Sequence, residues 1–434
     1  MRDVWAGADL GSTNVKVLLT DGAGTVLARA SRPTPRSGMH TDADALVDTL
    51  EELILDCADQ AGPLRLRAVC VAGVGEDGIL HAEGRPLGPA LSWFDPSRQA
   101  VRDRLTALRR PDDRARYGVE LDPARTLAAW ALLTPAEVSA ATGWVACTDY
   151  PALRWTRRAV MSSSIAARTG AWLLDQGAWD PHRIDPFLPY QLLPPVVPAG
   201  TLVGELRSVR LSGLLGSDAV VVAGGHDHPV AASVIHRQHP GAPLDSMGTA
   251  EVIVRTIDAG PPPSGVDQAP AILGTGRTAF TVLELHRNMS WLRRAGLGGH
   301  VDAVLAGNHA PALPRSPIFI PGGEGGEDPA WASAADALPD DARAAAAVWQ
   351  LAAAGAAALR HLAPEADVMY AAGGWTRAPG WMRLKTSAAA VPYRVPAEPE
   401  LTALGAAHLA LPGAIAPVPM WEILPSPIPP PWKP

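Results

Sequence analysis

An aspartate stands between two histidines in the stretch VVVAGGHDHPV, residues 220–230, where Asp227 is flanked by His226 and His228. These residue types allow three interpretations: a metal site, a catalytic carboxylate at the end of a strand, or a polar turn. A carboxylate can accept a proton as a general base, and two histidines one residue apart can both bind a metal. Because a zinc site needs a third and a fourth ligand, and no second histidine pair with helical spacing occurs, we favour histidines that pack or touch a substrate.

Three further stretches have glycine turns of the kind that lie against phosphates or flat ligands. They are DLGSTNVK at 9–16, SMGTAE at 246–251 and AAGGWTRAPGW at 371–381. Small residues with exposed N–H groups let a backbone approach a phosphate closely, and Asp9 beside the first turn could hold Mg²⁺ through water. The second turn repeats this chemistry, and the third suits a flat ligand such as adenine. A plain turn explains each stretch alone, but the three in this order indicate a nucleotide site.

The elements that must position these motifs alternate between strand and helix. Two apolar segments around DGAG, residues 21–24, predict a β-hairpin within 4–32, and a second hairpin-like stretch at 244–258 echoes it. This echo predicts two lobes of related architecture. The other predicted segments are a capped helix at 42–60, a buried strand at 66–75, mostly helix and loop at 98–190, strand–turn–helix at 218–236 and 366–390, a surface loop at 321–341, a buried helix at 344–359, and an extended proline-rich tail at 425–434.

The composition is that of a folded protein with a large core. Of 434 residues, 47% are apolar and 19% charged, and the net charge of 37 − 44 = −7 disfavours a nucleic-acid or membrane-surface partner, which needs basic patches. Three scattered cysteines, Cys57, Cys70 and Cys147, indicate buried free thiols. No signal peptide is evident at the N-terminus, so we expect a cytoplasmic location. A homodimer is compatible with the sequence.

The chain resembles the FGGY family of carbohydrate kinases, and the resemblance runs nearly end to end in the same order. Its motifs are DLGSTNVK at 9–16, GVGEDGILHAEGRPLGPALSWFDPSR at 73–98, GAWLLDQGAWDP at 170–181, AGGHDHPVAA at 223–232, DSMGTAEV at 245–252, AAGGWTRAPGWMRLKTSAAAVP at 371–392 and ELTALGAAHLA at 400–410. The resemblance implies an α/β chain with two actin-like (ribonuclease H-like) domains, at 1–238 and 239–434, and an interdomain cleft for ATP and substrate.

The resemblance also implies ATP- and Mg²⁺-dependent phosphorylation of a hydroxyl on a small sugar, ketose, polyol or cyclitol. Asp227 falls on the family's catalytic base, which accepts the hydroxyl proton as the phosphoryl group arrives. Asp9 falls near the metal and the phosphates, so Asp9 and Asp227 are the expected metal ligands. The residues expected around the nucleotide are Asp9, Gly11, Ser12, Thr13, Asn14 and Lys16 in the first domain, and Gly248, Thr249, Gly373 and Gly374 in the second.

Substrate recognition is expected from polar residues of the first domain, because carboxylates and arginine can each bond adjacent hydroxyls. The residues predicted to bind substrate are Glu76, Asp77, Trp93, Asp95, Arg98, His226 and His228. Alternatives stay open for three of them: a helix cap for Arg98, a structural ion pair for Glu76, and packing with one ring face toward the pocket for Trp93.

Two other functions are compatible with the residues. One is a metal-dependent hydrolase that uses His226, Asp227 and His228, and the other is a non-catalytic ATP-binding regulatory protein of the same fold. The regulatory alternative is motivated by the second domain, which departs from the family pattern. This domain is shorter than in typical family members and has RAPGW after the nucleoside turn. The chain has no G-x-x-x-x-G-K-[ST] loop, no dinucleotide-binding glycine pattern and no protein-kinase signature, so we exclude those phosphate-binding schemes.

Overall fold

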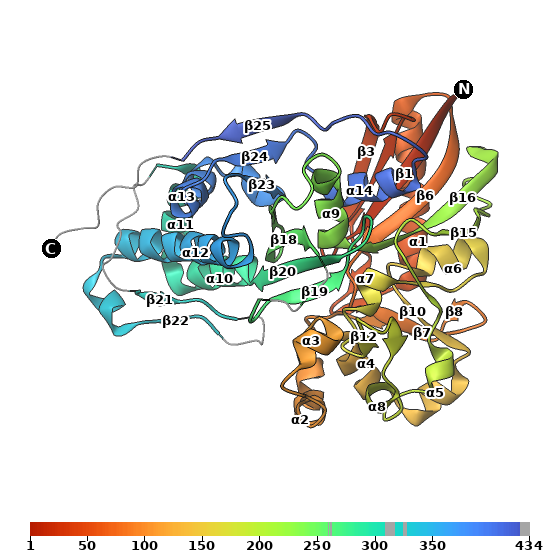
Figure 1. Ribbon diagram of the computed structural model, residues 1–434, viewed down its shortest axis with the longest axis horizontal. Coiled ribbons are helices and arrows are strands. Elements are labelled where there is room, and N and C mark those ends of the chain that lie inside the picture. The colour runs from red at the N-terminus through yellow and green to blue at the C-terminus, as the bar shows by residue number, and fades with distance from the viewer. Residues whose placement is uncertain (259, 261–262, 309–316, 324–327, 426–434) are drawn as a thin grey trace. The chain divides into compact units, whose positions relative to one another are not determined.

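The computed structural model describes residues 1–258, 260, 263–308, 317–323 and 328–425 (Figure 1). The chain forms two compact units. Unit 1 contains Met1–Gln238, Ile257–Thr278 and Glu400–Pro417, and unit 2 contains His239–Thr256, Ala279–Pro399 and Val418–Pro434. The first change of unit coincides with the predicted division after residue 238, but two later segments return to unit 1. Apart from its first residue, the predicted proline-rich tail lies outside the described residues.

Unit 1 is built on a six-stranded sheet with the order β15-β16-β6-β1-β2-β3. Strands β1, β2 and β3 form an antiparallel meander, whereas β6 runs parallel to β1 and to β16. The predicted hairpin is therefore three strands, because the chain turns once at 11–13 and again at DGAG. The strands are β1 (Arg2–Leu10), β2 (Asn14–Thr20), β3 (Val26–Pro33), β6 (Leu64–Gly73), β15 (Leu202–Glu205) and β16 (Leu215–His226).

Helices cover both faces of this sheet. The predicted helix at 42–60 is confirmed as α1 (Ala43–Ala61), and it begins where the Asp42 side chain accepts a hydrogen bond from the Ala45 N–H. It packs on β2 and β3, while α9 (Asp227–His236) and α14 (Leu401–Ala410) lie against the opposite face. Alternate residues of β6 fill the two cores, with Val69 and Val71 on the α1 side and Cys70 on the other.

A region of short elements fills the rest of unit 1, with a core of tryptophans that includes Trp130 and Trp144. Its elements are β4 (Arg36–Ser37), β5 (His40–Thr41), β7 (Gly78–Ala82), β8 (Arg85–Pro86), β9 (Ala90–Leu91), η1 (Pro96–Val101), α2 (Arg102–Thr106), α3 (Asp113–Tyr117), α4 (Thr126–Leu132), α5 (Pro135–Ala140), β10 (Gly143–Ala146), α6 (Tyr150–Thr156), β11 (Met161–Ser162), α7 (Ser163–Ala166), β12 (Trp172–Leu173), β13 (Ala178–Trp179), α8 (Pro181–Ile184), η2 (Tyr190–Leu192), β14 (Val196–Val197) and β19 (Asp267–Pro270).

Unit 2 repeats the strand plan of unit 1. Strand β17 (Leu244–Met247) pairs antiparallel with β18 (Glu251–Ile257) and parallel with β23 (Met369–Ala372), as β1 pairs with β2 and β6. Strand β20 (Arg277–Leu283) lies beyond β18, and β24 (Tyr393–Pro396) and β25 (Met420–Ile423) lie beyond β23. The echo between the two hairpin stretches in the sequence therefore corresponds to the same sheet topology in both units.

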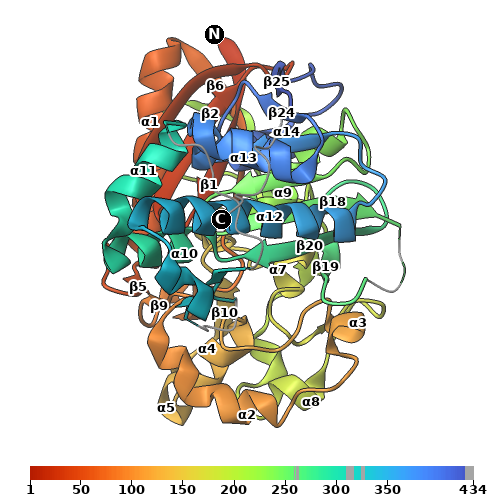
Figure 2. The same ribbon diagram turned by 90° about the vertical axis from the view of Figure 1, so that its left-hand side faces the viewer.

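The helices of unit 2 pack together over its sheet. In Figures 1 and 2, α11 (Gly298–Ala306), α12 (Asp340–Leu362) and α13 (Pro379–Ala389) lie side by side. Helix α12 has the length and composition of a membrane span, but 61% of its most apolar window is buried in the protein. The prediction of a buried helix at 344–359 is thus confirmed. The remaining described elements are α10 (Leu285–Leu292), η3 (Arg293–Leu297), β21 (Phe319–Ile320), β22 (Ala330–Trp331), η4 (Ser333–Ala337) and η5 (Gly374–Arg377).

Candidate active site

Three parallel strands of unit 1 end at one edge of the sheet and bring the key carboxylates together there. Gly73 at the end of β6 is the register partner of Leu10 in β1 and of His226 in β16. Asp9 precedes Leu10, and Asp227 follows His226 as the first residue of α9. The strand β16 reaches this edge through Gly224, where a Cβ atom would lie 1.9 Å from the Val71 carbonyl oxygen. Only glycine fits such an approach.

One oxygen of the Asp227 carboxylate accepts a hydrogen bond from the His228 backbone and lies within ion-pair distance of both neighbouring imidazole rings. The backbone N–H of His228 donates to Oδ1 over 2.7 Å, and Nδ1 of His226 lies 3.1 Å from the same oxygen. Nε2 of His228 lies 3.8 Å from it, and burial lowers the pKa of this histidine, against the opposing charge of Asp227. Within the described part of the chain, Oδ2 has no hydrogen-bond or ion-pair partner. The carboxylate, 21% exposed, therefore has one oxygen fixed and one available.

Asp9 is a buried carboxylate that lacks a full set of partners. Its Oδ2 lies 3.8 Å from Nζ of Lys16, which is itself 2.6 Å from Oε2 of Glu400. Its Oδ1 is buried, and no described residue donates a hydrogen bond to it. Burial raises the pKa of Asp9 to about 7, with Lys16 opposing the shift and the negative charge of Asp227 adding to it. An additional cation beside Asp9 would satisfy this oxygen.

A buried chain of ion pairs extends from His226 into unit 1. Nε2 of His226 lies 3.7 Å from Oε2 of Glu76, whose Oε1 accepts a 2.7 Å hydrogen bond from Nε of Arg168. Asp267 accepts from Nη1 of Arg168 at 3.2 Å and from Nη2 of Arg125 at 3.3 Å. Burial would raise the pKa of Glu76, but Arg168, His226 and Arg125 together hold it well below its usual value.

Sequence reasoning did not find Arg125, Arg168 or Asp267. These residues lie in three segments far apart in the chain, and none stands in a glycine turn or a recognisable charge pattern. The only available signal is the abundance of arginine in 98–190, which does not single out two positions. Glu76 was predicted, and its ion pair with Arg168 matches the structural alternative left open for it.

Asp77 lies beside Glu76, and its partner is Arg98. Burial raises the pKa of Asp77 to about 7, against the effect of Arg98, whose Nη2 is 3.7 Å from Oδ1. The Arg98 guanidinium is 1% exposed and donates to four backbone carbonyl oxygens, those of Leu91, Glu76, Ala124 and Arg125. Both of its Nη groups are thus engaged by the protein's own backbone, which fits a structural role, and its contact with substrate stays a prediction.

The stretch around Trp93 lies close to the first glycine turn. Nε1 of Trp93 donates to Oγ of Ser12 over 3.1 Å, so one predicted substrate residue contacts one predicted phosphate residue. Asp95 caps η1, where its side chain accepts from the Ser97 N–H at 2.7 Å. The turn itself closes through the Gly11 N–H, which donates to the Asn14 carbonyl oxygen.

In unit 2 the two predicted nucleotide turns are neighbours. Gly248 and Thr249 follow β17, Gly373 and Gly374 follow β23, and these two strands are paired in parallel. Nε1 of Trp375 donates to the Gly248 carbonyl oxygen over 3.0 Å and so ties the turns together. Thr249 and Gly248 are exposed. The structure thus brings together the four residues predicted for the nucleotide in this unit.

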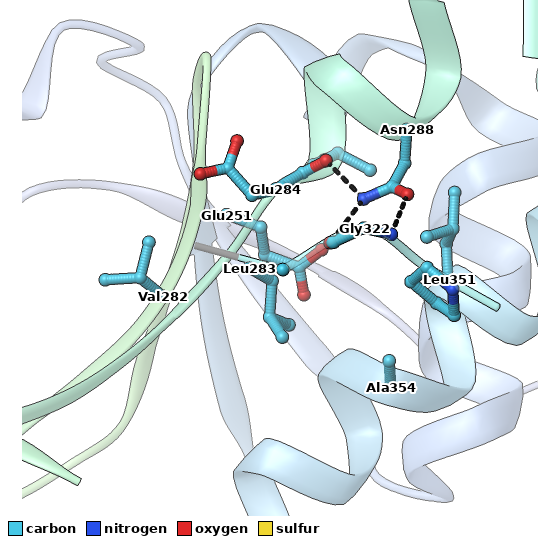
Figure 3. A pocket seen from close by; sticks show the side chains of 11 residues that line it. Glu251, Val282, Leu283, Glu284, Asn288, Gly322, Leu351 and Ala354 are labelled. Atoms are coloured by element: carbon cyan, nitrogen blue, oxygen red, sulfur yellow. Dashed lines mark hydrogen bonds between the residues drawn. The ribbon is translucent and has the colours of Figure 1, made fainter. Parts of the chain in front are cut away.

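A cavity of about 70 Å³ lies elsewhere in unit 2 (Figure 3). It is lined by Glu251, by 282–285 and Asn288 at the start of α10, by 321–323, and by two residues of α12. Asn288 shapes its wall, because its amide donates to the Glu284 carbonyl oxygen and accepts from the Gly322 N–H. None of the four predicted nucleotide residues of unit 2 lines this cavity.

Comparison with known proteins shows the family of this chain. Residues 4–233, more than half of its length, match the N-terminal domain of the FGGY family of carbohydrate kinases. The chain belongs to this family. A xylulose kinase of Streptomyces rubiginosus is 26% identical over an alignment that covers 93% of this chain and 86% of that protein. A xylulose kinase of Streptomyces coelicolor is 29% identical over 56% of this FGGY chain and 52% of its own length, about half of that relative.

Solved structures confirm the fold of this FGGY chain. The xylulose kinase from Rhodospirillum rubrum superposes with a TM-score of 0.81 over 98% of this chain and 94% of the other, at 21% identity. At that identity the likeness concerns the fold alone. The predicted α/β architecture of two actin-like domains is therefore confirmed, in agreement with the repeated strand plan of the two units.

Proposed function

We propose that this FGGY chain is an ATP-dependent kinase that transfers the γ-phosphoryl group to a hydroxyl of a small sugar, ketose, polyol or cyclitol. The observation that carries the proposal is the state of Asp227. Its carboxylate stands at the edge of the unit 1 sheet. Oδ1 accepts from the His228 N–H and lies 3.1 Å from Nδ1 of His226, and Oδ2 is available for an acceptor hydroxyl. The family membership and the xylulose kinase relatives support the same reaction class.

Asp227 would act as the general base. An alcohol is a weak nucleophile, and a carboxylate oxygen beside the hydroxyl can take its proton as the oxygen–phosphorus bond forms. The His228 N–H in the first turn of α9 donates to Oδ1 of Asp227 and so orients the carboxylate. Asp227 thus has the position that the step requires.

The residues around Asp9 fit a divalent cation. A buried carboxylate oxygen without a hydrogen-bond partner, with a neighbouring negative charge that raises its pKa, is stabilised by an added positive charge. Asp9 would hold Mg²⁺ beside the negative charge of Asp227, and the bound ion would neutralise charge on the transferred phosphate. The turns at 248–249 and 373–374, in which Gly248, Thr249 and Gly374 are exposed, would hold ATP through backbone N–H groups.

The buried polar residues of unit 1 around Glu76 and Asp77, called here the polar wall, suit a neutral polyhydroxyl acceptor. The arginines Arg125 and Arg168 are each paired with carboxylates, so the buried charges of this wall are largely balanced. Asp77 supplies a buried Oδ1 without a hydrogen bond from any described residue, and Trp93 supplies a half-buried ring. Such groups can bond hydroxyls and cover the apolar face of a sugar.

A coupled assay of ADP release tests the proposal across ketopentoses, ketohexoses, linear polyols and cyclitols. We expect one class to give turnover well above the ATPase rate without acceptor, and mass spectrometry to identify a phosphorylated product. ATP binding without turnover on any acceptor would favour the regulatory alternative. Stoichiometric tightly bound zinc, with hydrolysis in place of transfer, would favour the hydrolase.

A further inference from the structure

The ring of His226 lies between two carboxylates. Its Nδ1 is 3.1 Å from Oδ1 of Asp227, and its Nε2 is 3.7 Å from Oε2 of Glu76. The side chain is 8% exposed, so water reaches little of it. His226 was predicted to bind substrate, but both of its ring nitrogen atoms face carboxylates of the protein.

Contacts from several directions fix His226. The backbone N–H of this residue donates to Oγ of Ser164 over 3.0 Å, and Arg168 anchors Glu76, which lies beside the imidazole ring. The backbone at Gly75 lies against the ring, because a Cβ atom at this position would be 2.6 Å from Cδ2 of His226. A glycine here makes the room that the ring occupies.

A carboxylate with a backbone N–H and a buried imidazole nitrogen beside one of its oxygens no longer has two equivalent oxygens. The final torsion of an aspartate is broad and roughly two-fold, so a free carboxylate readily exchanges its oxygens. In this chain the His228 N–H and the His226 ring both lie at Oδ1, which leaves Oδ2 turned away from them. The orientation of the Asp227 carboxylate therefore depends on the side chain of the preceding residue, His226.

We propose that His226 is a positioning residue that fixes the rotation of the Asp227 carboxylate, with Glu76 and Arg168 as its anchor. The inference rests on the proposed kinase function and adds to it a second residue on which turnover depends. Misplacing a reacting group by about 1 Å can cost on the order of 100-fold in rate. A change at His226 should lower kcat, and leave the KM of the acceptor and the Kd of ATP near their wild-type values.

Two amide substitutions separate the two contacts of the ring. In His226→Asn the amide nitrogen can lie near the place of Nδ1, and in His226→Gln it can reach the place of Nε2. We expect His226→Ala and His226→Gln to lose roughly 10- to 100-fold in kcat, while His226→Asn keeps most of it. A merely structural histidine would not produce this order, since both amides differ from imidazole in shape.

Gly75→Ala provides an independent test that alters no polar group. The added methyl group must displace the His226 ring, so kcat should fall as in His226→Ala. The matched control is His182→Ala, which removes an exposed histidine of α8 and should leave kcat unchanged. A rise in acceptor KM with unchanged kcat in His226→Ala would overturn the inference in favour of direct substrate contact, and equal losses in all three His226 variants would also overturn it.

Crystal structures give a readout that does not depend on activity. We expect the Asp227 carboxylate to be rotated or present in two orientations in His226→Ala, and to keep its wild-type orientation in His226→Asn. An unchanged carboxylate in His226→Ala would overturn the positioning role even if the protein proved not to be a kinase. Conversely, an inactive wild type with the expected rotation would contradict the proposed function alone.

Discussion

Gly373 contacts the backbone of Met247 so closely that a Cβ atom at residue 373 would lie 2.1 Å from the Met247 carbonyl oxygen. Its φ of 96° also lies in the region that favours glycine. Gly373→Ala should therefore displace the turn after β23 and weaken ATP binding by at least about 10-fold, as measured by calorimetry. Gly299→Ala in α11 is the matched control, because it lies outside the predicted turns and no atom lies within 4 Å of its added Cβ. Equal ATP affinity in both variants would argue against a nucleotide at this turn.

Asp227→Asn should remove the general base without removing the hydrogen-bonding shape of the side chain. We expect kcat to fall by roughly 10²- to 10⁴-fold, the usual contribution of a general base, while the Kd of ATP stays within a few fold. Asp218→Asn is a suitable control, because this exposed carboxylate of β16 pairs with Arg67 on the surface. Near-normal turnover of Asp227→Asn would show that another group takes the proton.

Asp9 should make the metal-free protein less stable as pH rises. Burial raises its folded-state pKa to about 7, above its unfolded value near 3.8, so the folded state binds more protons between these values. Its contribution to stability is then complete below pH ~4 and is lost as pH rises through ~7. Asp9→Asn should remove this loss, so that at pH 8 without metal the variant melts at a higher temperature than wild type.

The test compares the free energy of unfolding of wild type with that of Asp9→Asn at each pH. The comparison is needed because burial also raises the pKa values of Asp77, Asp149 and Glu251 to about 7. We expect the free energy of unfolding of Asp9→Asn to exceed that of wild type by on the order of a few kcal/mol at pH 8, and the two to be equal near pH 4. Added Mg²⁺ should stabilise wild type and have less effect on the variant. A variant that is less stable than wild type at pH 8 without metal would contradict this account.

Lys385 should be essential to the stability of unit 2. It is fully buried and forms ion pairs with Glu251 and, at 2.8 Å, with Asp245, while Gly355 of α12 leaves room for them. Lys385→Met would leave two buried carboxylates without their cation, at a cost of about 3–5 kcal/mol. Chemical denaturation followed by circular dichroism measures the change.

Two further variants control for the loss of Lys385. Arg394→Met breaks an exposed pair with Glu422 and should cost only about 0–1 kcal/mol. Adding Glu251→Gln to Lys385→Met should recover part of the lost stability, because it removes one of the buried charges. If the single Lys385 variant were as stable as the Arg394 variant, the buried pairs would not contribute as argued.

The strand plan and the glycine turns could be predicted from the sequence because they depend on local signals. Apolar runs that end in Gly-Gly or Gly-Ser/Thr mark the edges of β1, β16, β17 and β23, and the strand ends are where Asp9 and Asp227 lie. The capped helix after Asp42 is local in the same sense. These features need no knowledge of which segments meet in space.

The ion pairs around Glu76 could not be predicted, because they join segments that only the tertiary fold brings together. Asp267 belongs to a segment that returns to unit 1 after the chain has begun unit 2. Arg98 shows the same limit: its type suits hydroxyl recognition, but the sequence does not reveal the packing that buries it against four backbone carbonyl oxygens. Whether an arginine faces a ligand or the backbone is decided by contacts distant in sequence.

Because α14 returns to unit 1 late in the sequence, it affects the order in which the nascent chain folds. This helix covers one face of the first sheet, where Gly7 lets Ala403 approach so closely that a Cβ atom would be 1.9 Å from its carbonyl oxygen. Domains generally fold as they leave the ribosome, N-terminal parts first. Here the sheet that emerges first keeps part of an apolar face uncovered until residue 410 has been translated, because α9 covers only some of it, so chaperone demand should fall on the earliest-made part of the protein.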